Sequence, residues 1–205
     1  MSKRAPKQPA AERRRRILDG ASSVFATSSY ARADTAELAA AAGVKPSALY
    51  RYFPSKRDLY LAVLREASPR LLRLWERAFA DAEDPLQGLW AIGMAYYDHS
   101  IGRSPMMRLW FQAMSETSDP DVRAAVRETL TGAVDVIAAN IADGQARGIV
   151  RRDVDPRVAA WHFMGIGIMF DLLAVLGLSE ELDRPTAEAW GRFFIDSIRE
   201  GPQTP

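Results

Sequence analysis

Residues 35–56 read TAELAAAAGVKPSALYRYFPSK, and this stretch predicts two short helices joined by a tight turn. Asp34 or Thr35 is the expected cap of the first helix, because each side chain can accept a hydrogen bond from a backbone N–H. Gly43 is expected to end that helix, since the residue beyond a helix end often needs a positive φ. Pro46 suits the first turn of the next helix, where no backbone N–H is required. The sequence therefore predicts a helix-turn-helix.

The second of these helices has two chemically different faces. Leu49 and Phe53 are four residues apart and are predicted to point inward together. Ser47, Tyr50 and Arg51 share roughly the opposite face, and each carries a hydrogen-bond donor. A short helix with an apolar back and a polar, cationic front fits the major groove of DNA. We therefore expect this helix to read the DNA.

Charge is distributed unevenly along the chain. Its net charge is only +1, but residues 1–57 carry twelve Lys or Arg against four Asp or Glu, a net charge of +8. The remaining residues carry a net charge of −7. This asymmetry is typical of a nucleic-acid-binding end attached to a body with another role. A membrane surface would also attract the basic end, so charge alone leaves both alternatives open.

The spacing of apolar and aromatic residues over about residues 13–60 resembles that of the TetR family of transcriptional regulators. The residues that carry the resemblance are Phe25, Tyr30, Thr35, Leu38, Ala39, Ala42, Gly43, Val44, Leu49, Tyr50, Tyr52, Phe53, Lys56 and Leu59. The sequence departs from the family at Ser29, where Gly is frequent, and at Lys45-Pro46-Ser47, which replaces a more usual Ser-x-Gly. The operator sequence therefore cannot be carried over from the family.

The resemblance implies an all-α fold with an N-terminal three-helix helix-turn-helix domain and a larger C-terminal helical domain for ligand binding and dimerisation. The predicted divisions are a flexible basic arm at 1–12, the helix-turn-helix domain at 13–57, the ligand-binding and dimerisation domain at 58–201 and a tail at 202–205. The first helix is expected to open at Arg13–Arg16, and a loop is expected from Thr27 to Ala33 with Tyr30 as its anchor.

The resemblance also implies roles for individual residues. It places Tyr50, Tyr52 and Lys56 near phosphates, with Thr35 capping its helix against the backbone. Arg51 and Ser47 are candidates for base edges, because Arg can pair bidentately with guanine. The predicted DNA-binding set is Thr35, Lys45, Ser47, Tyr50, Arg51, Tyr52 and Lys56. Tyr52 could instead pack in the core, and Lys56 could be an exposed lysine at a helix start.

The next helix is expected to start with Ser55 as its cap and Asp58 completing a capping box. Pro69 should interrupt this helix, because an interior proline removes a hydrogen bond. We hypothesise a kink there that acts as a lever joint between the domains. The alternative is simply two helices that meet.

Further helices are expected to start at Pro85, Met106, Pro120 and Pro156, with breaks at Gly102 and Pro105. The helix from Pro156 to about Gly177 is the most apolar and long enough to span a bilayer, but His162, Asp171 and three glycines oppose that alternative. Burial against a second subunit accounts for it better. The resemblance implies a homodimer formed through the last two long helices.

The body is rich in Met and aromatic side chains, which line sites for flat or hydrophobic ligands. The predicted ligand-binding residues are Trp75, Trp90, Met94, Tyr97, Met107, Trp110, Phe111, Met114, Trp161, His162, Phe170 and Asp171. Tyr97, His162 and Asp171 would orient the ligand. The alternatives are an ordinary core for the apolar residues, a satisfied buried position for His162 and a place at the dimer seam for Asp171.

Few features indicate catalysis. The chain lacks Cys, its two His residues have no clustered acids, and it has no phosphate-binding loop or nucleophile elbow. We therefore expect no enzyme, no cofactor and no metal. The basic N-terminus lacks the apolar segment of a secretory signal, which favours the cytoplasm.

The sequence thus predicts a ligand-responsive transcriptional repressor. It would bind a near-palindromic operator as a homodimer and be released by a small hydrophobic or aromatic effector, with no membrane partner. The alternatives are an activator or a ligand-independent regulator of the same fold and, less favoured, a helical enzyme, a carrier or a membrane-active basic protein.

Overall fold

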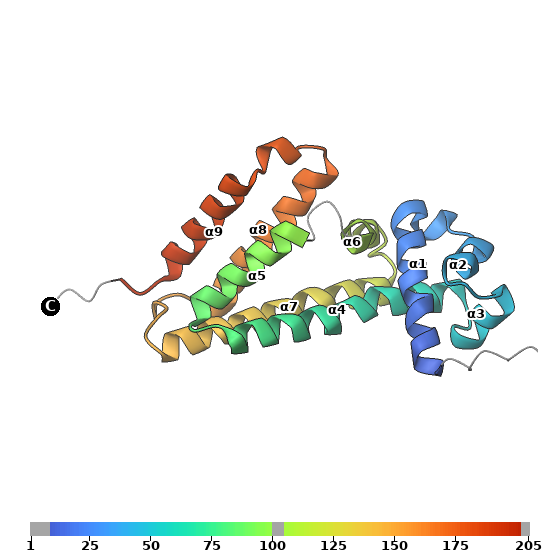
Figure 1. The fold of residues 1–205 in the computed structure, drawn as a ribbon, viewed down its shortest axis with the longest axis horizontal. Helices are drawn as coiled ribbons and strands as arrows, with labels where there is room; N and C mark the ends of the chain where they lie inside the picture. Colours follow the sequence, from blue (N-terminus) through green and yellow to red (C-terminus); the bar gives the residue numbers. More distant parts are fainter. Residues whose placement is uncertain (1–8, 100–104, 202–205) are drawn as a thin grey trace, which may run out of the picture. The chain divides into compact units, whose positions relative to one another are not determined.

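The structure is a computed structural model that describes residues 9–99 and 105–201. The regular elements of these residues are helices, apart from one isolated antiparallel bridge between Val150 and Arg199 (Figure 1). In order they are α1 Ala10–Arg32, α2 Thr35–Ala41, α3 Pro46–Tyr52, α4 Lys56–Asp81, α5 Pro85–His99, α6 Pro105–Ser115, α7 Pro120–Ala146, α8 Pro156–Val175, the 3-10 turn η1 Ser179–Glu181 and α9 Arg184–Ile198. The prediction of an all-α fold is confirmed.

The chain forms two compact units, and the boundary between them falls inside two long helices. The first unit holds the described residues up to Ala67 together with Pro105–Val126, and the second holds the rest. The predicted division between a DNA-binding part and a ligand-binding part stays a prediction. The compact units group the chain differently, because α6 and the start of α7 belong with the N-terminal helices.

One predicted interruption is wrong. Helix α4 runs without a break from Lys56 to Asp81, through Pro69. A proline removes one hydrogen bond from the ladder, and here the helix continues on both sides of it. The predicted break at Gly102, much of the predicted arm and the predicted tail fall on residues 1–8, 100–104 and 202–205, outside the described residues.

The end of α1 differs from the expected loop. The helix begins at Ala10, before the expected Arg13, and it extends to Arg32 across a kink at Ser29. Ser29 has φ 65° and ψ 162°, a backbone conformation that glycine adopts far more easily than serine. After the kink, the Tyr30 ring packs 4.7 Å from the Tyr60 ring and 6.2 Å from the Phe25 ring. Tyr30 is therefore the anchor that was expected.

The helix-turn-helix is formed largely as predicted. Gly43 has φ 62°, and its N–H donates to the Ala40 carbonyl while the next N–H donates to Ala39, which closes the end of α2. Pro46 is the first residue of α3, whose Leu49 is buried together with Phe53. Ser55 caps α4 as expected, with Asp58 N–H donating to Ser55 Oγ over 3.0 Å and the Ser55 hydroxyl donating to Asp58 Oδ2 over 2.6 Å, an arrangement close to a capping box.

The expected cap of α2 is wrong. Asp34 occupies the cap position, but its side chain makes no capping hydrogen bond. Thr35 is the first residue of α2, and its hydroxyl lies 2.9 Å from the Tyr50 hydroxyl instead. The Thr35 side chain therefore joins α2 to α3, and the contact depends on both helices being in place.

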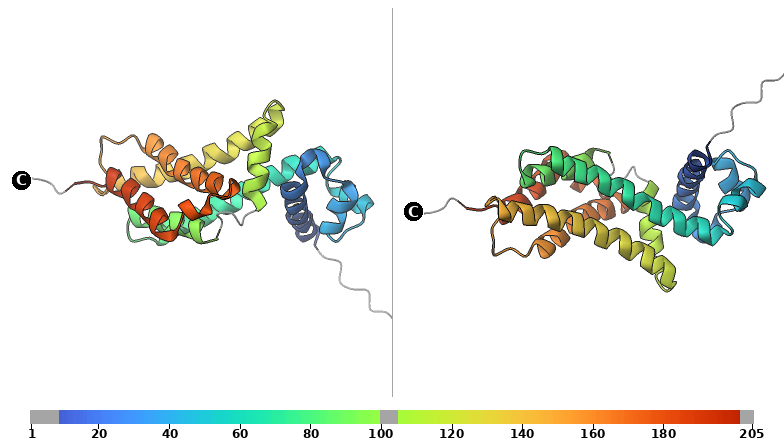
Figure 2. Two further views of the ribbon diagram at one scale, coloured as in Figure 1. Left: turned by 90° about the horizontal axis from the view of Figure 1, so that it is seen from above. Right: turned by 90° about the horizontal axis from the view of Figure 1, so that it is seen from below.

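In the second unit, α5 packs against α8 and α9, and the views in Figures 1 and 2 show these three helices side by side. Glycine allows the tightest of the contacts between them, at Gly191, whereas a Cβ at Gly93 or Gly167 would make an ordinary van der Waals contact. A Cβ on Gly93 would lie 3.7 Å from the Phe163 ring, a Cβ on Gly167 3.7 Å from the Tyr96 ring, and a Cβ on Gly191 3.0 Å from the Trp90 ring. The core beneath them is built from Trp75, Leu86, Leu89, Ile92, Ala133, Val134, Ile137, Ile141, Val150, Ala159, Ala160, Phe194, Ile195 and Ile198.

One charged group is buried in this unit. Asp171 on α8 is 1% exposed, and the Tyr96 hydroxyl donates a hydrogen bond to its Oδ2. Removal from water raises the pKa of Asp171 to about 6, although the hydrogen bond from Tyr96 opposes the rise. The same burial and the nearby carboxylate raise the pKa of Tyr96, so the tyrosine keeps its proton. Ionised Asp171 therefore costs stability at neutral pH.

We expect Ser29→Gly to stabilise the protein by about 1 kcal/mol, because relief of the strained φ outweighs the extra freedom of glycine in the unfolded chain. Thermal unfolding should show a rise in Tm of about 3 °C. Ser23→Gly, at an exposed helical position of α1, is the matched control and should destabilise by about 0.5 kcal/mol. Equal destabilisation by both changes would contradict the strain at Ser29.

We expect Asp171→Asn to become more stable than the wild type as the pH rises from 4 to 7. Over this range the folded wild type must give up a proton that the unfolded chain has already released, so rising pH lowers its free energy of unfolding, by about 2–3 kcal/mol in total. Denaturant unfolding at several pH values measures the difference. Asp183→Asn is the control, because hydrogen bonds from Thr186 lower the pKa of Asp183 and reverse the trend. A difference independent of pH would refute the effect.

Candidate nucleic-acid interface and ligand-binding region

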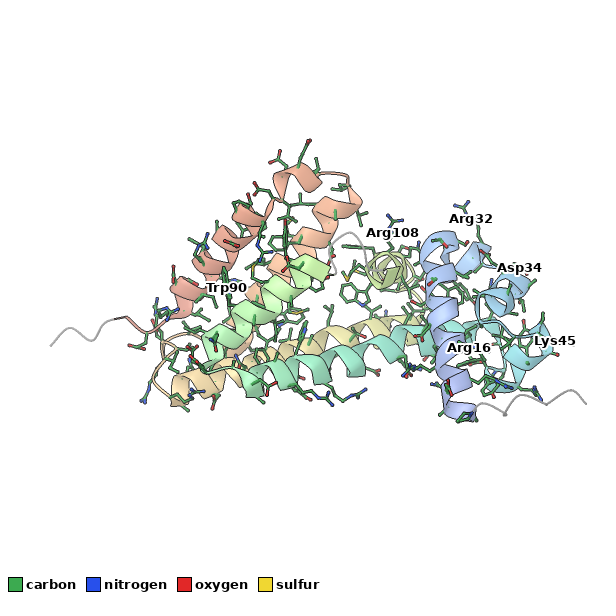
Figure 3. All side chains as sticks on the ribbon, in the orientation of Figure 1. Arg16, Arg32, Asp34, Lys45, Trp90 and Arg108 are labelled. Carbon is green, nitrogen blue, oxygen red and sulfur yellow. The ribbon has the colours of Figure 1, made fainter. Side chains whose placement is uncertain are left out.

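The outward face of α3 carries the donors that the sequence predicted. Ser47 and Arg51 are exposed, Tyr50 is 44% exposed, and Lys45 extends from the turn before the helix (Figure 3). Among the described residues, no side-chain hydrogen bond or ion pair engages Lys45, Ser47 or Arg51. These donors are therefore available to a partner outside the chain. Tyr50 is held in place by its contact with the Thr35 hydroxyl.

Lys56 has an internal role at the start of α4. Its ammonium donates to the carbonyls of Ala33 over 3.0 Å and Ala31 over 3.5 Å, and it lies 4.9 Å from the centre of the Tyr30 ring. A cation at this position complements the negative end of the α1 dipole. Tyr52, the last residue of α3, is half-buried, which fits either a core or a surface role.

Two residues that the sequence analysis did not single out position the helix-turn-helix. A Cβ on Gly20 would lie only 2.8 Å from the carbonyl of Ala41, so α1 lies directly against the backbone at the end of α2. One turn earlier, Arg16 Nε donates to the Ala42 carbonyl over 3.1 Å, and its Nη2 lies 3.5 Å from the Gly43 carbonyl. A glycine inside a helix is a sequence signal for such close packing.

A cluster of charges joins distant parts of the first unit. The Arg57 guanidinium donates to both carboxylate oxygens of Asp119, at 2.9 and 3.0 Å, and to Asp121 over 2.7 Å. These carboxylates raise the pKa of Arg57, and the guanidinium lowers the pKa of Asp119. Asp119 also accepts the N–H groups of Asp121 and Val122 at the start of α7. These bonds connect the start of α4 to the start of α7. Local sequence patterns could not predict the pair, because Arg57 and Asp119 are 62 residues apart.

The structure divides the predicted ligand-binding residues between the two units. Those on α6 belong to the first unit, where α6 packs on α1 and Gln112 Nε2 donates to the Ala26 carbonyl over 3.3 Å. The members of this group are Met107, Trp110, Phe111 and Met114. The second unit holds Trp75, Trp90, Met94, Tyr97, Trp161, His162, Phe170 and Asp171. The single site that the sequence analysis predicted remains a prediction.

Within the second unit, three of the predicted residues lie together. The Phe170 ring lies 6.3 Å from the Tyr97 ring and stacks 5.3 Å from the Trp190 ring, and Asp171 follows it on α8. The Tyr97 hydroxyl donates to the Leu182 carbonyl over 3.1 Å. Three aromatic rings and one buried acid therefore gather where α5, α8 and α9 meet.

The other predicted residues of the second unit have different surroundings. Trp75 is part of the core. The Trp90 ring lies against Gly191, and the Arg192 guanidinium is 5.9 Å from the centre of this ring (Figure 3). His162 is exposed in the single chain, so the core of one subunit does not bury it. It lies beside the exposed Trp161 on the outer face of α8, because the core of the single chain covers only the other side of this helix.

The outer faces of α8 and α9 carry large apolar side chains that the single chain leaves exposed. They are Val158, Trp161, Met169, Leu172, Val175, Leu176, Trp190 and Phe193, with Phe193 81% exposed. By length and composition α8 could cross a membrane, with a mean hydropathy of 1.7 over 18 residues. Such a helix also occurs in the cores and interfaces of soluble proteins, so this criterion decides nothing alone. Over residues 9–99 and 105–201, no group of His, Asp and Glu could hold a metal ion.

Comparison with known proteins identifies the family. Residues 17–63 match the family described as "Bacterial regulatory proteins, tetR family". The HTH-type transcriptional activator FasR of Mycolicibacterium smegmatis is 33% identical over 136 residues, which cover 66% of this chain but only 62% of FasR. The HTH-type transcriptional repressor KstR2 of the same organism is 27% identical over 151 residues, 72% of this chain and 73% of KstR2.

A solved structure extends the likeness over most of the chain. The transcriptional regulator FadR of Bacillus subtilis, in complex with stearoyl-CoA, is similar with a TM-score of 0.75 at 16% identity, covering 90% of this chain and 98% of FadR. At this identity the likeness concerns the fold. These relatives are transcriptional regulators, which agrees with the prediction that the protein is not an enzyme. The match over residues 17–63 shows that the helix-turn-helix region of this chain belongs to the TetR family of bacterial regulatory proteins, and the solved structure shows that the rest of the chain has the fold of such a regulator.

Proposed function

We propose that the protein is a DNA-binding repressor that acts as a homodimer in the cytoplasm and is released from its operator by a small hydrophobic or aromatic effector. The observation that carries this proposal is the front of α3, where Lys45, Ser47 and Arg51 are exposed and have no side-chain partner in the described part of the chain. Folding leaves these donors unused although they lie on the basic end of the chain. Phosphates and base edges supply matching acceptors.

The residues proposed for DNA binding have separate roles. Arg51 and Ser47 would face base edges, and Lys45, Tyr50 and Tyr52 would face phosphates. Thr35 would act through Tyr50, because their hydroxyls are hydrogen-bonded. Lys56 would contact phosphate with the part of its ammonium that the carbonyls of α1 leave free.

The proposed homodimer covers the exposed apolar faces of α8 and α9. On α8, Val158, Trp161, Leu172 and Val175 are separated by 3, 11 and 3 residues, which are close to whole numbers of helical turns and place them on one helix face. Phe193 on α9 adds a ring that is almost fully exposed. A second copy of the same face would bury these side chains and place two α3 helices in successive major grooves, about 34–36 Å apart.

The proposed effector would bind the arrangement of the dimer that does not fit the operator better than the arrangement that does. The affinity for DNA then falls by the difference between the effector's binding free energies for the two arrangements. The FadR structure is of a complex with stearoyl-CoA, and the named relatives include both an activator and a repressor. The alternatives are therefore an activator or a ligand-independent regulator of this fold. A reporter gene placed behind the operator distinguishes repression from activation.

We expect Arg51→Ala and Lys45→Ala to weaken DNA binding in different ways. Loss of Arg51 should cost about 1–3 kcal/mol on the operator and little on random DNA, because a base contact is removed. Loss of Lys45 should weaken binding to both DNAs by a similar factor and reduce the salt slope of log K by about 0.9 for each subunit, about 1.8 for the dimer. Lys45 serves this test better than Lys56, whose removal would also free the end of α1.

Fluorescence anisotropy with operator and scrambled duplexes at several salt concentrations measures both effects. Glu83, an exposed residue of the second unit, supplies the control variant Glu83→Ala, which should change neither affinity nor slope. Identical behaviour of the Arg51 and Lys45 variants would rule out the proposed division of roles. Wild-type protein with no preference for any duplex from its own upstream region would rule out the function.

We expect Phe193→Asp to dissociate the dimer, because it replaces a ring worth about 1.5–3 kcal/mol of burial in each subunit with a charge. Sedimentation analysis should show a dimer dissociation constant raised about 100-fold or more. Ala142→Asp places the same charge at an exposed position of α7 and should leave the dimer intact. A wild-type protein that sediments as a monomer would refute the proposed dimer.

A further inference from the structure

The buried carboxylate of Asp171 has an oxygen that the fold leaves unused. Tyr96 donates its single hydroxyl proton to Oδ2, whereas Oδ1 is buried and has no hydrogen-bond partner among the described residues. A buried ionised oxygen without a donor is costly, and native proteins rarely keep one without a purpose. Hydrophobic burial of the α5–α8 contact does not require an acid at this place.

Helix packing directs the acid and its tyrosine toward each other. Gly167 lies one turn before Asp171 on α8, and a Cβ there would lie 3.7 Å from the Tyr96 ring. The Tyr96 ring thus lies beside α8 one turn before Asp171, with its hydroxyl at the carboxylate. Because Tyr96 is committed to Oδ2, the orientation of Asp171 is fixed with Oδ1 free to accept.

No cation pairs with this acid among the described residues, although α8 and α9 carry arginines. Arg184 pairs with Asp98 and Glu188, Arg192 lies over Trp90, and Arg157 pairs with Asp135. A buried carboxylate oxygen without a donor is suited to a group that carries N–H or O–H donors, and best to a cation.

We propose that Asp171 Oδ1 recognises a hydrogen-bond donor, an amine or a hydroxyl group, on an otherwise hydrophobic or aromatic effector. This inference rests on the proposed effector response and names the polar group that the effector carries. An ammonium group gains most, because it pairs with the carboxylate as a charge-assisted hydrogen bond. A ligand that presents a carboxylate at this place is rejected, because two like charges would meet in a dehydrated site. Tyr96 is a positioning residue that holds the acid.

The test uses three probes with one hydrophobic body, 4-phenylbutylamine, 4-phenylbutanol and 4-phenylbutanoate, titrated calorimetrically into the full-length protein at pH 8 without DNA. The wild type should bind the amine about tenfold or more tightly than the carboxylate, with the alcohol between them. In Asp171→Asn the Tyr96 proton points to the amide oxygen, so an NH2 group replaces Oδ1. The order of affinities should then reverse in favour of the carboxylate.

Asp183→Asn removes the same charge at the start of α9, outside this cluster, and keeps the helix cap, so it should leave the wild-type order unchanged. If circular dichroism shows that Asp171→Asn does not fold, Tyr96→Phe is the test variant. In this variant the Asp171 carboxylate has lost the hydrogen bond from the Tyr96 hydroxyl, so the protein should bind the amine more tightly than the wild type does. Equal affinities for amine and carboxylate, no binding of any donor probe, or an order unaffected by Asp171→Asn overturns the inference.

DNA release is measured separately, with the same probes added to the protein bound to its operator. An amine preference at Asp171 without release would uphold the donor site and refute the effector response of the proposed function. Release by the carboxylate and not by the amine would uphold that response and overturn the donor site. The two failures are therefore distinguishable.

Discussion

The close approach of α1 to the end of α2 is the contact on which the helix-turn-helix depends. Gly20 lets the two backbones approach so closely that a single added methyl group would overlap the carbonyl of Ala41. Arg16 then satisfies the Ala42 carbonyl at the end of α2, where the helix leaves its last carbonyls without partners. Since the turn at Gly43 leads directly into α3, this contact sets the direction in which Arg51 and Ser47 point.

Two further interactions fix the same small unit from other sides. Lys56 binds the carbonyls at the end of α1, and the Thr35 and Tyr50 hydroxyls join α2 to α3. None of these interactions is deeply buried, and each is worth little alone. Together they hold three short helices whose own length would leave them unstable in water. The cationic front of α3 is thereby preorganised, while the strained Ser29 beside Tyr30 costs stability in the same unit.

The second unit uses glycine in the same way, but between helices. A Cβ on Gly191 would lie 3.0 Å from the Trp90 ring, so the missing side chain allows α5 and α9 to pack closely. This packing consumes only one side of α8 and α9, so Trp161, Val175 and Phe193 remain on the other side. Their exposure is the physical reason to propose a second subunit. The same packing buries Asp171, and this burial raises the pKa of Asp171 because the ionised carboxylate is less stable there than in water.

Local signals in the sequence determined most of the helices. Gly43, Pro46 and the Ser55–Asp58 pair act within one turn of the chain, so their patterns predicted the helix ends correctly. Only the tertiary structure decided what lies far apart in sequence: the Arg57 contacts with Asp119 and Asp121, the Tyr96 bond to Asp171 and the place of Gly20 against α2. It also moved Thr35 from a cap to a partner of Tyr50 and carried α4 through Pro69. The reason is that capping and turn preferences depend on neighbouring residues, whereas burial, ion pairs and close helix contacts depend on which surfaces the folded chain brings together.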